Sequence, residues 1–189
     1  FIYHMIKSII FDWDGVFTSN FYDKISRVCN DENKLLEIES KYSDKNNSDD
    51  FWEELRKEFN IKNSNQELEG LFNYQIETGL LGLLIKLAKY ALYLLSNQIK
   101  ARTDYIKSNF NLTPFLQTFF SNEIGLIKPN KEIFLFVLDK IKLEPHECLF
   151  IDDTETNINT AKSLGFNAIK CENIDQLKKE LVSFSIYLD

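Results

Sequence analysis

Short apolar runs alternate with amphipathic segments from residue 80 to the end of the sequence, and no other feature constrains the fold as strongly. Runs such as "ALYLL" at 91–95 and "ECLFID" at 147–152 are typical of strands that are buried on both faces. Strands that alternate with helices predict a parallel sheet covered by helices on both sides. We therefore expect an α/β protein with a Rossmann-like, three-layer α/β/α core.

The same pattern places the individual elements. Strands are expected at 6–11, 91–95, 115–121, 147–153 and 166–171. Helices are expected at 82–89, 98–110, 130–142, 154–165 and 174–184. The longest apolar run, at 79–95, carries two lysines and is explained better by a helix followed by a strand than by a membrane span.

The stretch between the first strand and residue 80 has a different character. It is polar, rich in Asn, Asp, Glu and Lys, and helical in pattern, with no strand candidate. Its clearest piece begins at Ser48, a candidate N-cap that is followed by two acidic residues. A second helix start has Asn63 or Ser64 as its N-cap. These features predict a small helical cap.

The predicted core consists of residues 5–17 and 80–189, and residues 18–79 form the inserted cap. Residues 1–4 are expected to be a remnant of cloning, because Met5 begins a natural-looking start. The aromatic residues of the insert are expected to pack inside the cap and not against a substrate. They are Phe51, Trp52, Phe59, Phe72 and Tyr74.

Charge and cysteine content exclude several classes of protein. The net charge of -7 argues against nucleic acid or an anionic membrane as the partner. Cys29, Cys148 and Cys171 are far apart and odd in number, which fits neither a disulfide framework nor a zinc site. We expect core packing for these thiols and a reducing, cytoplasmic setting. The oligomeric state is not indicated.

Polar residues follow the ends of the predicted strands. Because ligands of open α/β sheets bind beyond the carboxyl ends of the strands, we expect these residues to converge. In chain order they are Asp12 and Asp14, Ser96 and Asn97, Lys128, and Asp152 and Asp153. Four carboxylates at one place repel each other unless a divalent cation lies among them, and all-oxygen ligands suit Mg²⁺. With a hydroxyl, an amide and a lysine nearby, the set favours phosphoryl transfer.

Four motifs carry a more specific indication. In order and spacing, "FDWDG", "LLSN", "KPNKEIF" and "FIDDTETNINTAKSLG" resemble the haloacid dehalogenase-like (HAD) hydrolase superfamily. The resemblance covers almost the whole predicted core, and the insert is similar to the small helical cap of that family. It implies a phosphatase-type member, which uses Mg²⁺ and hydrolyses a small phosphorylated metabolite through an aspartyl-phosphate intermediate.

The resemblance implies the catalytic roles. Asp12 would be the nucleophile that attacks phosphorus. Asp14 would protonate the leaving oxygen and then act as the base for the attacking water. Lys128 would neutralise charge on Asp12 and on the phosphoryl group.

The resemblance also implies the binding roles. The phosphate would be held by Ser96, by the backbone of Asn97, by Lys128 and by the backbone amide of Trp13. Asn157 is expected to tie down the loop after the second acid pair. The metal would be bound by Asp12, Asp14 (through its main-chain carbonyl), Asp152 and Asp153, with Asp153 favoured over Asp152 as the direct ligand.

These residues also bear on the other activities known for this family. Asp14 argues against a dehalogenase, because a halide leaving group needs no acid. Sugar phosphomutases of the family carry a histidine twelve residues after the nucleophile, where this chain has Lys24. A phosphotransferase or phosphomutase stays open, as does a catalytically weak regulatory protein that binds a phosphorylated metabolite. The substrate is not indicated by the sequence.

Overall fold

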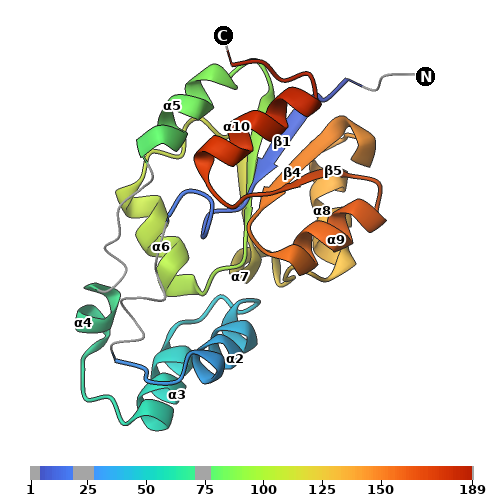
Figure 1. Ribbon diagram of the computed structural model, residues 1–189. Helices are drawn as coiled ribbons and strands as arrows, with labels where there is room; N and C mark the ends of the chain where they lie inside the picture. The colour runs from blue at the N-terminus through green and yellow to red at the C-terminus, as the bar shows by residue number, and fades with distance from the viewer. Residues whose placement is uncertain (1–4, 19–27, 71–77, 189) are drawn as a thin grey trace.

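A fully parallel, five-stranded sheet forms the centre of the protein (Figure 1). The computed structural model describes residues 5–18, 28–70 and 78–188. The strand order is β3-β2-β1-β4-β5, so both acid pairs of the sequence follow neighbouring central strands. The strands are β1 (Ser8–Phe11), β2 (Ala91–Ser96), β3 (Gln117–Phe120), β4 (Cys148–Asp152) and β5 (Asn167–Lys170).

Helices cover both faces of the sheet, which confirms the predicted three-layer α/β/α architecture (Figure 1). One apolar cluster joins one face to α5 (Thr78–Lys86), α6 (Lys100–Asn109) and α10 (Ile174–Ser183). A second cluster joins the other face to α8 (Lys131–Ile141) and α9 (Glu155–Ser163). Since the central strands are buried on both faces, their sequences are mostly apolar and do not alternate.

The cap lies beyond the carboxyl ends of the strands (Figure 1). It contains α2 (Glu32–Tyr42), α3 (Asp49–Phe59) and α4 (Asn65–Glu69), all inside the range predicted for the cap. Its apolar cluster also includes Ile99 and Ala101 at the start of α6, so the cap packs on the core there. The exact boundaries stay a prediction, because residues 19–27 and 71–77 lie outside the described ranges.

The aromatic side chains of the insert pack as predicted where the structure describes them. Phe51 and Trp52 are buried in the cap cluster and make an edge-to-face contact with each other. Phe59 is partly buried against the same cluster. Phe72 and Tyr74 lie outside the described residues.

The helix starts of the cap show one expected and one unexpected arrangement. Ser64 and Glu67 form a capping box, in which each side chain accepts a hydrogen bond from the other residue's backbone N–H. Ser48 stands at the N-cap position of α3 but makes no capping bond with its side chain. Asn47 Oδ1 instead accepts a 2.9 Å hydrogen bond from the Asp49 backbone N–H. Ser48 therefore marks the helix start by position only.

Tertiary packing moved some element boundaries away from the prediction. The helix expected at 82–89 is α5, which begins at Thr78 because Leu80, Leu83 and Leu84 pack on the sheet. Two short elements were not predicted: α7 (Ser121–Ile124) and the 3-10 helix η2 (Pro145–Glu147). The end of α9 agrees with the prediction, since Gly165 follows it with φ +91°.

The apolar run at 79–95 is divided between α5 and β2, as predicted. Within the described part of the chain, no helix has the length and apolar character needed to cross a membrane. Cys29, Cys148 and Cys171 are buried free thiols, and Cys148 opens β4, in agreement with the expected core packing.

Candidate active site

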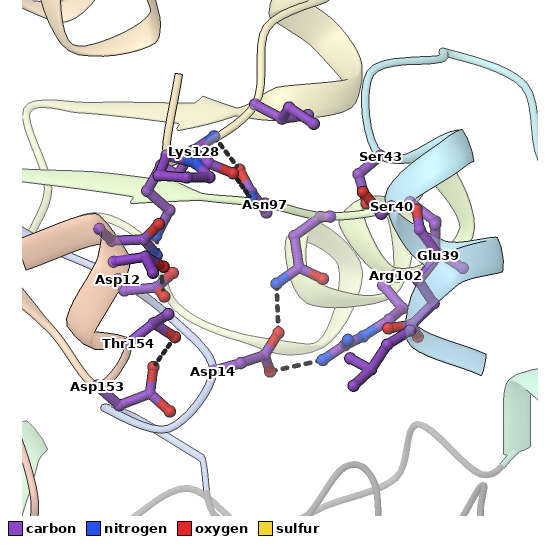
Figure 2. Close-up of a pocket in the computed structure, with 17 residues that line it drawn as sticks. Asp12, Asp14, Glu39, Ser40, Ser43, Asn97, Arg102, Lys128, Asp153 and Thr154 are labelled. Atoms are coloured by element: carbon purple, nitrogen blue, oxygen red, sulfur yellow. Dashed lines mark hydrogen bonds and ion pairs between the residues drawn. The ribbon is translucent and has the colours of Figure 1, made fainter. Parts of the chain in front are cut away.

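A cavity of about 260 Å³ lies between the strand ends and the cap. Core residues such as Asp12, Asn97 and Lys128 line it on one side. Figure 2 shows Glu39 and Ser40 of helix α2 across the cavity from Asp12. The cavity therefore joins the predicted catalytic residues to side chains of the cap.

Asp12 is held through both of its carboxylate oxygens. It follows β1, and its backbone N–H continues the sheet with a 2.8 Å bond to the Ile151 carbonyl. Oδ1 accepts a 2.7 Å hydrogen bond from the Trp13 N–H, and Oδ2 lies 2.9 Å from Lys128 Nζ. A carboxylate restrained in this way reaches the cavity in one orientation.

Lys128 lies between two of the acidic residues. It is 3% exposed, and its Nζ also lies 2.6 Å from Asp152 Oδ2. Its backbone is held by the Asn97 side chain, which donates to the Lys128 carbonyl at 2.8 Å and accepts its N–H at 2.9 Å. The Asn97 side chain thus positions Lys128, which leaves the Asn97 backbone for the predicted phosphate contact.

The second acid pair is divided between two environments. Asp152 is fully buried, and both of its oxygens accept hydrogen bonds from Asn157 Nδ2, at 3.1 and 3.0 Å. Asn157 thereby ties down this loop as expected. Asp153 is partly buried and lines the cavity, with Oδ1 accepting a 3.1 Å bond from Thr154 Oγ1. This difference supports Asp153 as the direct metal ligand of the pair.

Asp12, Asp152 and Asp153 can offer oxygens that all lie within 4.8 Å of one another. Burial raises the pKa of Asp12 to about 8; Lys128 opposes this rise, and Asp152 adds to it. Burial and Asp152 likewise raise the pKa of Asp153. Burial alone would lower the pKa of Lys128, but Asp12 and Asp152 outweigh burial and raise it. The single positive charge of Lys128 does not balance the three carboxylates. The oxygen atoms of these carboxylates fit Mg²⁺.

Gly15 allows the two acid pairs to approach each other. Its φ is +72°, and a Cβ on it would lie 1.9 Å from Asp153 Oδ2. We expect Gly15→Ala to destabilise the fold by about 1–2 kcal/mol and to weaken Mg²⁺ binding, because Asp153 must move away. Calorimetry with and without Mg²⁺ measures both effects.

Gly82→Ala is the matched control for this prediction. Gly82 lies in helix α5, and a Cβ added to it would meet no heavy atom within 4 Å. Alanine should therefore leave stability and Mg²⁺ binding unchanged or improved. Wild-type Mg²⁺ affinity in Gly15→Ala would contradict the proposed role of Gly15.

Asp14 is held away from the other carboxylates by residues that the sequence did not single out. Gln98 Nε2 donates to Asp14 Oδ2 at 2.6 Å, and Arg102 Nη2 lies 2.5 Å from Asp14 Oδ1 (Figure 2). Thr18 Oγ1 donates to Oδ1 at 3.1 Å. The sequence carried no specific signal for Arg102, since Lys100 is a cation in the same turn of α6 and forms an exposed ion pair with Asp104.

Ser96 and Trp13 lie behind the cavity wall. Among the described residues that line the cavity, Asn97 is present, but Ser96 and Trp13 are not. The Ser96 hydroxyl accepts a 2.9 Å hydrogen bond from Gln98 Nε2. The Trp13 ring stacks on Phe17, and the Trp13 backbone N–H donates to Asp12 Oδ1. The predicted phosphate contacts of Ser96 and Trp13 stay predictions.

The sequence profile of the haloacid dehalogenase-like hydrolases matches residues 6–165. The chain therefore belongs to the haloacid dehalogenase-like hydrolase family, as its four motifs predicted. It is a hydrolase whose fold and core residues agree with that family.

Relatives extend this comparison to named proteins. The chain is 28% identical over 201 residues to the D-ribitol-5-phosphate phosphatase of Bacteroides thetaiotaomicron, covering 94% of this chain and 97% of that protein. It is 34% identical over 146 residues to the flavin mononucleotide hydrolase 1 of Arabidopsis thaliana, which covers 71% of this chain but only 58% of the plant protein.

Solved structures show the same similarity. A HAD family enzyme of Bacteroides thetaiotaomicron, in complex with magnesium and inorganic phosphate, superposes with a TM-score of 0.76. The two proteins are 25% identical, and the match covers 91% of this chain and 98% of the other.

Proposed function

We propose that this protein is a magnesium-dependent phosphatase that transfers the phosphoryl group of a small metabolite to Asp12 and then to water. One observation carries the proposal: Asp12 shares Lys128 with Asp152 beside Asp153, whereas Asp14 is held separately by Gln98 and Arg102. The site thus contains a nucleophile within a cation site and a separate proton carrier. The phosphatase name of the Bacteroides relative supports the same reaction.

In the first step of the proposed reaction, an Asp12 oxygen forms a bond to phosphorus, and the bond from phosphorus to the ester oxygen breaks. Asp14 gives a proton to that oxygen, which leaves as an alcohol. In the second step, Asp14 takes a proton from water as the water oxygen attacks phosphorus. The bond to Asp12 then breaks, and inorganic phosphate is released.

The remaining residues stabilise charge and hold the reacting groups. Lys128 Nζ lies 2.9 Å from Asp12 Oδ2 and would also neutralise the phosphoryl oxygens, in a site where little water screens the interaction. Asp12, Asp153 and, behind them, Asp152 would hold Mg²⁺, with the main-chain carbonyl of Asp14. When bound, Mg²⁺ supplies further positive charge to the phosphoryl group.

The volume and lining of the cavity favour a small, hydroxylated leaving group. About 260 Å³ is below the roughly 300–1,000 Å³ typical of sites for drug-sized ligands. The cap contributes Glu39, Ser40 and Ser43, which can pair with hydroxyl groups. A sugar or polyol phosphate fits this volume better than a nucleotide with a tricyclic ring, so we favour the activity named for the Bacteroides relative over that named for the plant relative.

Other reactions of this fold receive less support. A phosphotransferase or phosphomutase would use the same Asp12 and Asp14, but no second acceptor site is evident among the described residues, and Lys24 lies outside them. A regulatory protein without turnover has no need for a separately held Asp14. The reducing, cytoplasmic setting stays a prediction.

We expect phosphate release from a panel of sugar and polyol phosphates in the presence of Mg²⁺ and none after chelation with EDTA. Mg²⁺ at 100 times its Kd should stabilise the fold by about 2.7 kcal/mol, which raises Tm by roughly 5–11 °C. Asp153→Asn should reduce both effects, and Asp104→Asn on the exposed face of α6 is the matched control. Turnover without Mg²⁺ would contradict the proposed reaction. A higher kcat/KM for flavin mononucleotide than for the sugar and polyol phosphates would contradict the proposed substrate class.

A further inference from the structure

Besides Thr18, two residues outside the four motifs contact Asp14 directly. Gln98 follows β2, and Arg102 lies in the first turn of α6. Gln98 is 1% exposed and Arg102 is 4% exposed, so the donor side of both contacts to Asp14 is buried. Figure 2 shows the two contacts converging on Asp14 between the Asp12 side of the cavity and the cap.

Gln98 holds its orientation at an energetic cost. Its Nε2 donates to Asp14 Oδ2 and to Ser96 Oγ, whereas its Oε1 is buried and has no hydrogen-bond partner in the structure as described. A buried acceptor without a partner costs about 1–3 kcal/mol. The reverse orientation of the amide would place Oε1 against the Asp14 carboxylate. The hydrogen bond to Asp14 therefore offsets the cost of leaving Oε1 without a partner.

The position of Arg102 is unfavourable for two reasons. A buried guanidinium needs an anionic partner, and a cation in the first turn of a helix is opposed by the helix dipole. The 2.5 Å contact with Asp14 Oδ1 provides the anion. Since Gln98 binds Oδ2 and Arg102 binds Oδ1, the two residues restrain both oxygens of Asp14.

Gln98 is also linked to the cap. Its backbone N–H donates a 2.9 Å hydrogen bond to Ser121 Oγ, and the same hydroxyl donates a 2.5 Å bond to the Ser43 carbonyl. Ser121 is fully buried at the start of α7, and Ser43 follows helix α2 of the cap. The position of Gln98, and with it that of Asp14, is thus tied to the docked cap.

We propose that Gln98 and Arg102 are positioning residues that hold Asp14 for proton transfer to the ester oxygen of the substrate. This inference rests on the proposed phosphatase function. Proton transfer requires the donor and acceptor atoms to be about 2.6–3.2 Å apart, so a rotated Asp14 cannot complete it. The attack of Asp12 on phosphorus does not depend on these two residues, because Trp13 and Lys128 hold Asp12.

The leaving group distinguishes this role from a general structural one. p-Nitrophenolate departs from phosphorus without a proton, whereas the alkoxide of glycerol 2-phosphate needs one. We expect Gln98→Leu and Arg102→Met to lower kcat/KM for glycerol 2-phosphate by about 10–100-fold and for p-nitrophenyl phosphate by less than about 3-fold. The ratio kcat/KM is the readout because it covers only the steps up to loss of the leaving group.

Matched variants complete the experiment. Arg102→Lys keeps the charge and should restore part of the activity on glycerol 2-phosphate. Arg56→Met in the cap and Gln117→Leu on β3 lie away from the cavity and should behave as wild type with both esters. A Mg²⁺-induced rise in Tm equal to that of the wild type shows that the variants fold and keep the cation site.

Two results would overturn the inference: equal losses on both esters, or no loss on glycerol 2-phosphate. Either result leaves the proposed function intact, since the wild type still hydrolyses both esters. A wild-type protein that hydrolyses neither these two esters nor any member of the sugar and polyol phosphate panel with Mg²⁺ would instead overturn the proposed function, and this inference with it.

Discussion

Asp12→Asn is expected to lower phosphate release by at least about 10³-fold, because the amide cannot form the bond to phosphorus on which the proposed reaction depends. The substitution changes little in volume, so Trp13 and Lys128 stay in place around it. The measurement is steady-state phosphate release from p-nitrophenyl phosphate with saturating Mg²⁺. This ester needs no proton on its leaving group, so the loss reports on the nucleophile and not on Asp14.

Asp104→Asn is the matched control for the nucleophile. Asp104 forms an exposed ion pair with Lys100 on α6, outside the cavity, and its amide variant should keep wild-type activity. More than one tenth of the wild-type activity in Asp12→Asn would show that another group attacks phosphorus. Circular dichroism of both variants establishes that they fold.

Lys128→Met should have the largest effect on stability. Lys128 is buried between Asp12 and Asp152, and removal of one partner of a buried ionic cluster costs about 3–5 kcal/mol. For a chain of this length, that loss lowers Tm by roughly 6–20 °C. Activity should also fall by about 10²–10³-fold, because the positive charge that stabilises the phosphoryl group is lost.

Mg²⁺ gives this prediction a second measurement. A bound cation supplies positive charge among the same carboxylates, so the stability loss of Lys128→Met should be smaller with Mg²⁺ than with EDTA. Lys107→Met is the control, since Lys107 is half exposed in its ion pair with Glu123 and should cost less than about 1 kcal/mol. A loss in Lys128→Met as small as in this control would contradict the role of Lys128 as the centre of the cluster.

Much of the fold was predictable from local pattern. The strands around Phe11, Leu94 and Ile151 are buried on both faces. A strand buried in this way needs apolar residues on both sides, so it appears in the sequence as a continuous apolar run. Element boundaries were less predictable, as α5 shows, because its packing on the sheet overrode the weak signals for its start.

The principal site residues were predictable for a topological reason. In a parallel sheet all carboxyl ends lie at one edge, so residues that directly follow the strands meet there whatever lies between them in sequence. This is how Asp12 and Asp152 come close together at the ends of β1 and β4, and Lys128 reaches both from the segment that follows α7. Gln98 and Arg102 were missed because they follow the motif by a few residues, where only the direction of each side chain decides whether it reaches the site.

The sequence by itself determined the layered α/β architecture, the family and the edge of the sheet at which chemistry takes place, because each depends on repeated patterns along the chain. Only the tertiary structure decided how deeply each carboxylate is buried and which side chains contact it. It buried Asp152 behind Asp153, shared Lys128 between Asp12 and Asp152, and placed Asp14 against Gln98 and Arg102 beneath the cap. These outcomes depend on side-chain directions and on the docking of the cap, which join residues far apart in sequence through contacts that leave no local pattern.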